Sequence, residues 1–253
     1  MATPRPDHVT TALRLAANAE ALLVFDLETS DKPDGVHKEG GHTGTPTGKV
    51  MQLAARRYAW DGRAGTGVLT HAMNVIMDDA DLLPCCLHPR AEAVHGIAIA
   101  ELRGPAGNPH LASVVRMSPR EAWSDFLALA DGAVLMGHNA IGFDIPFANR
   151  ELARFGLPPV LDATVAIDTL LLVQTVLSLG ANRLRAAADF LEITTDPALD
   201  HNAEGDIDTT FEIWKAMLPR CRDFSGRYLA KGGNPYAGRL GGLGSAWTDE
   251  AAA

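Results

Sequence analysis

The sequence of 253 residues lacks the features that mark several large classes of protein. Its three cysteines, two of them adjacent, are too few and too poorly spaced for a disulfide framework, and they favour a reducing compartment. No apolar run reaches the roughly 18 residues that a membrane helix needs, and the charged first residues contain no signal-peptide core. The sequence therefore predicts a cytoplasmic protein with no membrane contact.

An excess of positive charge is also missing. The formal net charge is -9, so the field of the whole protein repels nucleic acids. A polyanionic substrate would need metal ions or a local group of Lys and Arg to offset that repulsion. The composition, 47% apolar and 21% charged, is that of an ordinary globular protein able to bury one sizeable core.

The composition along the chain predicts one main domain. We expect it to cover residues 20–220, after an N-terminal extension at 1–19 and before a glycine-rich C-terminal tail at 221–253. Residues 31–49 contain almost no apolar side chains, which predicts a long flexible loop within the domain.

Patterns of apolar residues predict the elements of that domain. Three apolar runs indicate a meander of strands at 21–27, 50–60 and 65–77. Helical and strand patterns alternate after residue 118, which predicts an α/β or α+β sheet covered by helices. The last helix has an apolar stripe at Ile207, Phe211, Trp214 and Leu218.

The first group of polar residues with chemical potential lies in the segment VFDLET. Asp26 and Glu28 stand two residues apart at the end of an apolar strand, so both carboxylates lie on one face of it. Their backbones are roughly 6–7 Å apart, which allows them to share metal ions. The alternative is an acidic strand end beside a turn, which is the commoner origin of so short a pattern.

The second group lies in the segment GHNAIGFDIPF. Asp144 stands at the start of a helix with Pro146 two places on, which by itself favours a role as helix N-cap. His138 and Asn139, however, come directly after a strand, where loop residues are often presented to a ligand.

The third group is the segment DHNAEGD. A helix start explains Asp206, which the macrodipole would stabilise, but it leaves His201 unexplained. Asp206 also leads a helical row that continues through Thr210 and Ile213, beside the buried stripe, so its carboxylate should face the sheet. An acid at a core face needs a partner, and a cation is the natural one.

Taken together, the three groups resemble the five signature residues of the DEDDh exonuclease superfamily. Two further segments are similar to its epsilon-type proofreading members, AEAVHGI at 91–97 and AIDTLLL at 166–172. The residues that correspond to the family's catalytic set are Asp26, Glu28, Asp144, His201 and Asp206.

The resemblance implies a ribonuclease H-like α/β fold, with a mixed five-stranded sheet flanked by helices and its first three strands antiparallel. It implies two Mg²⁺ ions, replaceable by Mn²⁺, held by the four carboxylates, with His201 as general base. Thr29 and His95 would line the pocket for the terminal nucleotide, and Asn139 would support the second motif. The implied activity is 3′–5′ hydrolysis of DNA to nucleoside monophosphates, in repair or proofreading.

The subfamily and the substrate stay open at this point. The spacing from Asn139 to Asp144 is similar to that of exonuclease I and of the three-prime repair exonucleases, whereas VHGI is similar to proofreading subunits. Single-stranded DNA is the expected partner; alternatives are trimming of RNA ends and action as a subunit bound to a DNA polymerase. The segment GTPTGKV lacks the spacing of a phosphate-binding loop, and adjacent Cys85 and Cys86 lack that of a zinc site.

Overall fold

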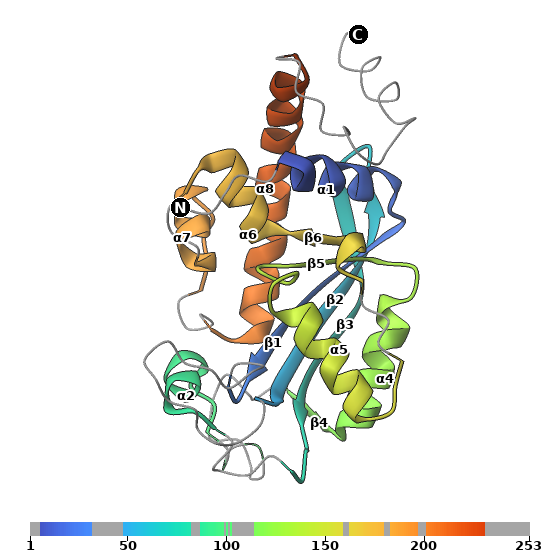
Figure 1. Cartoon of the computed structure of the whole chain (residues 1–253), viewed down its shortest axis with the longest axis vertical. Coiled ribbons are helices and arrows are strands. Elements are labelled where there is room, and N and C mark those ends of the chain that lie inside the picture. Colours follow the sequence, from blue (N-terminus) through green and yellow to red (C-terminus); the bar gives the residue numbers. More distant parts are fainter. Residues whose placement is uncertain are drawn as a thin grey trace.

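The computed structural model describes residues 6–31, 48–81, 87–98, 100, 102, 114–158, 162–179, 183–196 and 201–230. Six strands form one mixed sheet, in the order β4-β3-β2-β1-β5-β6, with helices on both faces (Figure 1). The strands are β1 (Ala21–Thr29), β2 (Val50–Asp61), β3 (Thr66–Met77), β4 (Val115–Met117), β5 (Val134–Gly137) and β6 (Ala166–Asp168). The helices are α1 (Pro6–Asn18), α2 (Pro89–His95), α4 (Pro119–Ala130), α5 (Asp144–Arg154), α6 (Thr169–Leu172), α7 (Leu184–Phe190) and α8 (Ala203–Ala230).

The sheet confirms the predicted α/β class and the antiparallel meander of β1, β2 and β3. Strands β5 and β6 then continue the sheet in parallel with β1. The expected number of five strands is wrong, because β4 adds a sixth that runs parallel to β3 at the edge. Only three residues long, β4 is too short to show an alternating pattern in the sequence.

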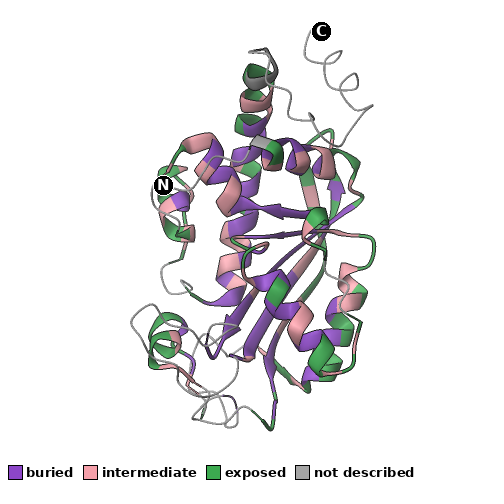
Figure 2. Ribbon diagram, viewed as in Figure 1, coloured by how far each residue is buried: buried purple, intermediate pink, exposed green. Residues whose placement is uncertain are grey.

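Each face of the sheet carries its own apolar core. Helices α1 and α8 cover one face, where Trp214 is fully buried, and helices α4 and α5 cover the other around Trp123. Figure 2 shows β1 buried between these layers, with exposed residues on the outer sides of the helices, whereas much of β3 is exposed. Because the side chains of a strand alternate between the faces, the even-numbered residues of β1 point toward α8.

The ends of the predicted domain contain regular structure. Within the predicted extension at 1–19, α1 buries Val9, Ala12 and Ala16 in the core under α8. Helix α8 continues past residue 220 to Ala230. The predicted loop at 31–49 and the predicted tail lie largely outside the described residues, as do Cys85 and Cys86. Among the described helices, none is long and apolar enough to cross a membrane.

Candidate metal and catalytic site

Three of the predicted carboxylates meet at the end of β1. Asp26 and Glu28 lie on the face of β1 that α8 covers, and Asp206 lies in the first turn of α8. One oxygen of each of these three carboxylates lies within 4.8 Å of the others. The expectation that Asp26 and Glu28 share a face is therefore confirmed, and oxygen atoms in this arrangement suit a hard divalent cation.

Asp206 reaches this place because of the pattern along α8. The row that Asp206 leads is buried at Thr210 and Ile213, so this side of the helix faces the sheet as expected. Helix α8 begins at a cap that sequence reasoning missed, since the Asn202 side chain accepts a hydrogen bond of 3.0 Å from the backbone N–H of Glu204. An Asn directly before a helical pattern was the available signal.

Asp144 enters the site from the edge of β1. Strand β5 pairs with β1 only from Leu22 to Val24, so the edge beyond Val24 is open to the start of α5. There the Asp144 carboxylate accepts a hydrogen bond from the backbone of Leu27. The capping interpretation is wrong, because Asp144 is the first residue of α5 and the cap position is held by Phe143.

The electrostatics of the cluster are those of acids crowded together. Burial raises the pKa of Asp26 well above its usual value, and the charge of Asp144 raises it further. The pKa of Glu28 is raised well above its usual value by burial and then by Asp26, Asp206 and Asp144. Burial, followed by the charge of Asp168, raises the pKa of Asp144 to about 8. A divalent cation would relieve this repulsion.

His95 contacts Thr29, the residue after Glu28, and His201 lies near His95, but the two histidines have different environments. His201 is exposed and has a left-handed backbone, with φ of 58°, just before α8 begins. His95 is buried: its Nδ1 accepts from the N–H of Ile97 at 3.0 Å, so its Nε2 carries the proton and donates to the carbonyl of Thr29 at 3.3 Å. Burial, with the nearby His201, lowers the pKa of His95 to about 4, so this ring is neutral at pH 7.

Asn139 belongs to the loop that delivers Asp144. Its backbone is left-handed, with φ of 72°, and its carbonyl accepts from the N–H groups of Gly142 and Phe143. The loop is held by Asp168, whose carboxylate accepts from the N–H of Asn139 at 2.9 Å and of Ile141 at 3.1 Å. Sequence reasoning gave Asp168 no role, although the similarity of AIDTLLL to the family was the available signal.

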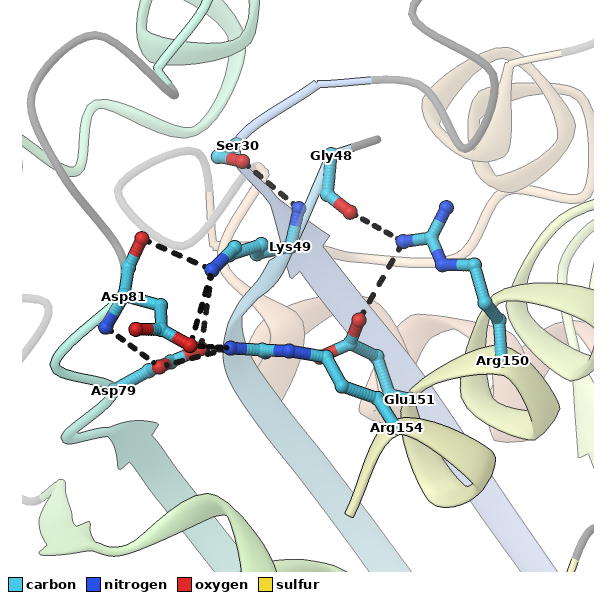
Figure 3. Close-up of polar contacts among 8 residues, drawn as sticks. All are labelled: Ser30, Gly48, Lys49, Asp79, Asp81, Arg150, Glu151 and Arg154. Atoms are coloured by element: carbon cyan, nitrogen blue, oxygen red, sulfur yellow. Dashed lines mark hydrogen bonds and ion pairs between the residues drawn. The ribbon is translucent and has the colours of Figure 1, made fainter. Parts of the chain in front are cut away.

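A second group of charges lies near the same end of the sheet (Figure 3). Arg154 of α5 donates to Asp79 at 2.6 Å, to Asp81 at 3.0 Å and to Glu151 at 3.2 Å. Burial alone would raise the pKa of Asp79. Hydrogen bonds from Arg154 and from the backbone of Asp81, with the charges of Arg154 and Lys49, outweigh burial and lower it.

These paired charges hold the start of β2 against α5. The Lys49 backbone N–H donates to the hydroxyl of Ser30 at 2.9 Å, and the N–H of Ser30 donates to the Lys49 carbonyl at 2.8 Å. Arg150 of α5 donates to the carbonyl of Gly48. The contacts fix the end of β1, the start of β2 and α5 relative to one another, as Figure 3 shows.

Comparison with known proteins agrees with this arrangement. Residues 107–214 match the RNase_T family, described as exonuclease, and this range contains Asp144, His201 and Asp206 but not Asp26 or Glu28. A DNA polymerase III of the PolC type from Ureaplasma parvum serovar 3 is 31% identical over 87 residues, which are 34% of this chain and 6% of that protein. The resemblance to exonucleases is confirmed over this part of the chain.

Solved structures of Escherichia coli exonuclease I share the fold. A complex with single-stranded DNA is 18% identical with a TM-score of 0.58, covering 85% of this chain and 43% of that one. A complex with a dA16 oligonucleotide is 16% identical with a TM-score of 0.60, covering 85% and 44%. The chain thus spans less than half the length of these solved relatives.

Proposed function

We propose that this chain is a metal-dependent exonuclease of the DEDDh type that removes nucleoside monophosphates from the 3′ end of DNA. The observation that carries the proposal is the meeting of Asp26, Glu28 and Asp206 oxygens within 4.8 Å, with the buried carboxyl of Asp144 close by. Exonuclease I, which has the same fold, has been solved with single-stranded DNA. Single-stranded DNA is therefore the substrate we propose.

The four carboxylates fit a pair of Mg²⁺ ions, with Mn²⁺ as a substitute, because hard oxygen donors suit both. Such ions, when bound, supply an activated water and stabilise the departing oxygen. Asp168 orients the loop that carries Asn139 and so holds Asp144 in place. The Nε2–H of His95 holds the carbonyl of Thr29, which shapes the end of β1 where a terminal nucleotide would lie.

His201 is the general base in this proposal. Its exposed position before α8 gives it access to a water, and an imidazole nitrogen can accept a proton from that water. We expect His201→Ala to lower kcat by about 10²- to 10⁴-fold, the usual contribution of a positioned base, while Mn²⁺ affinity measured by calorimetry changes little. Near-normal turnover of this variant would remove His201 from the mechanism.

The assay that tests the activity offers 3′-labelled and 5′-labelled single-stranded DNA, duplex DNA and RNA, with Mg²⁺ or with EDTA, and Asp26→Ala as control. Mononucleotides released from the 3′ end of single-stranded DNA only with metal are the expected result. Faster release of mononucleotides from RNA than from DNA would show that RNA is the substrate. No metal-dependent release from any of these substrates would overturn the proposed function.

A role beside a DNA polymerase is a second candidate, favoured by the match to the PolC-type polymerase. Stimulation of the nuclease by an added replicative polymerase would support this role. An unchanged rate together with no co-elution on gel filtration would argue against it.

A further inference from the structure

Glu204 belongs to the third motif but has no part in the chemistry proposed above. Its Oε1 accepts a hydrogen bond of 3.2 Å from Arg56 of β2, and its Oε2 accepts one of 2.8 Å from Nδ2 of Asn74 on β3. Oδ1 of Asn74 accepts in turn from Nε2 of Gln52 at 2.8 Å. Arg56 also pairs with Asp208, one helical turn after Glu204.

These residues share a sheet face with the candidate metal ligands. In the register of β1 and β2, Gln52 lies directly opposite Glu28. Asn74 lies opposite Ala54, which in turn lies opposite Asp26. Directly opposed residues project to the same face, so this polar network stands beside the acidic cluster, under the start of α8.

The network ties down the part of α8 that carries Asp206. Glu204 and Asp208 are four residues apart, so they lie on one side of the helix, and Arg56 binds both. Asp206 lies two residues after Glu204 in the helix, and its carboxylate meets those of Asp26 and Glu28 on β1. A change in the rotation or height of the first turn of α8 would therefore move Asp206 away from Asp26.

We propose that Glu204 is a positioning residue for the third motif. Through Arg56 and Asn74 it fixes the first turn of α8 on β2 and β3, so that Asp206 meets the carboxylates of β1. This inference rests on the proposed exonuclease function for its kinetic part, whereas its structural part can be measured without a substrate.

The test exchanges the chemical groups at two positions. Glu204→Gln replaces one carboxylate oxygen by a donor, so the side chain can no longer accept from both Arg56 and Asn74. Asn74→Asp places a second carboxylate against that of Glu204. The double variant restores the network with only the bond between positions 204 and 74 reversed. The new amide donates to the new carboxylate and accepts from Arg56, and the new carboxylate still accepts from Gln52. Glu212→Gln is the matched control, since Glu212 forms an exposed ion pair with Lys215 further along α8.

We expect Glu204→Gln to lower kcat on single-stranded DNA by about 10-fold with KM unchanged, in the range found for groups that orient metal ligands. Asn74→Asp should lower kcat further, and the double variant should return within about 3-fold of the parent, as direct coupling requires. Hydrogen exchange at the amides of residues 203–208 should be faster in both single variants and should return to the parent rate in the double variant. Affinity for Mn²⁺ should follow the same order.

Three results would overturn the inference. The first is single variants with the same kcat and hydrogen exchange as Glu212→Gln. The others are a double variant in which the two losses of kcat simply add, and single variants that change KM and leave kcat as in the parent. If the parent protein cleaves no nucleic acid, the proposed function fails, and the hydrogen exchange and Mn²⁺ affinity still decide whether Glu204 positions the motif.

Discussion

Glu28 and Asp79 are both buried, each 8% exposed, and lie near the same end of the sheet, yet their pKa values move in opposite directions. The charged neighbours that shift the pKa of Glu28 are other carboxylates, and they raise it. Those of Asp79 include Arg154 and Lys49, and with their hydrogen bonds they lower it. The two carboxyls therefore behave in opposite ways because carboxylates surround Glu28 and cations surround Asp79, and because Glu28 is also enclosed more deeply by the protein.

The contrast separates two uses of acidic residues within one helix. At one end of α5, Asp144 joins a group of acids. The charges that shift its pKa are those of other carboxylates, Asp168 and Asp206, and both raise it. At the other end, Glu151 is buried but lies within 3.2 Å of Arg154. The paired group of Asp79, Glu151, Arg154 and Lys49 supplies its own cations, whereas the acidic cluster is suited to cations from solution.

The largest expected effect comes from neutralising one acid of the cluster. Asp26→Asn should lower kcat by more than about 100-fold, since groups that merely orient metal ligands already cost about 10- to 100-fold. The same change should raise the melting temperature of the metal-free protein, because it removes a buried acid whose ionised form is unfavourable among like charges. Steady-state assays and thermal unfolding in EDTA measure the two effects. A variant that is less stable without metal would contradict the picture of unrelieved repulsion.

Breaking the paired group should lower the stability of the protein and leave its Mg²⁺ dependence unchanged. Arg154→Met leaves Asp79 and Glu151 without their shared guanidinium, and we expect a loss of about 1–3 kcal/mol in the free energy of unfolding. Urea unfolding measures the loss, with Arg185→Met as control, because the exposed pair of Arg185 with Asp189 should contribute about 0.5 kcal/mol or less. The Mg²⁺ dependence of Arg154→Met should equal that of the parent. A shifted dependence would mean that the two groups are not separate.

The parts of the site that local periodicity controls could be predicted from the sequence. The period of two in a strand places Asp26 and Glu28 on one face, and the helical row led by Asp206 places that carboxylate toward the sheet. Both features involve residues a few positions apart, so no knowledge of packing was needed. The family resemblance then joined these segments to Asp144 and His201.

The parts that depend on packing between distant segments could not be predicted in this way. Asp144 reaches the site because the short β5 leaves the edge of β1 open, which is a property of the sheet and not of the segment GHNAIGFD. Arg56 and Glu204 are 148 residues apart in the chain, and no local pattern in either segment predicts that the two side chains meet. For the same reason Asp144 looked like a helix cap when its segment was considered alone.

The smallest expected effect is on the pH dependence of stability, which should differ between variants of the acidic cluster and of the paired group. The pKa of Asp144 is about 8 in the folded protein and near its usual 3.8 when unfolded, so the folded state holds that proton more tightly. Its contribution to stability is therefore complete below about pH 4 and is lost as the pH rises through 8.

Mg²⁺ binds the ionised form, so the rise in melting temperature on adding Mg²⁺ should be larger at pH 8.5 than at pH 6, by a few degrees. Asp144→Asn should reduce both the loss of stability without metal and the difference in the Mg²⁺ effect, with Asp26 and Glu28 accounting for what remains, whereas Arg154→Met should preserve both. A Mg²⁺ effect that is equal at the two pH values in the parent would show that the cluster is already ionised without a cation, and the contrast with Asp79 would then lose its basis.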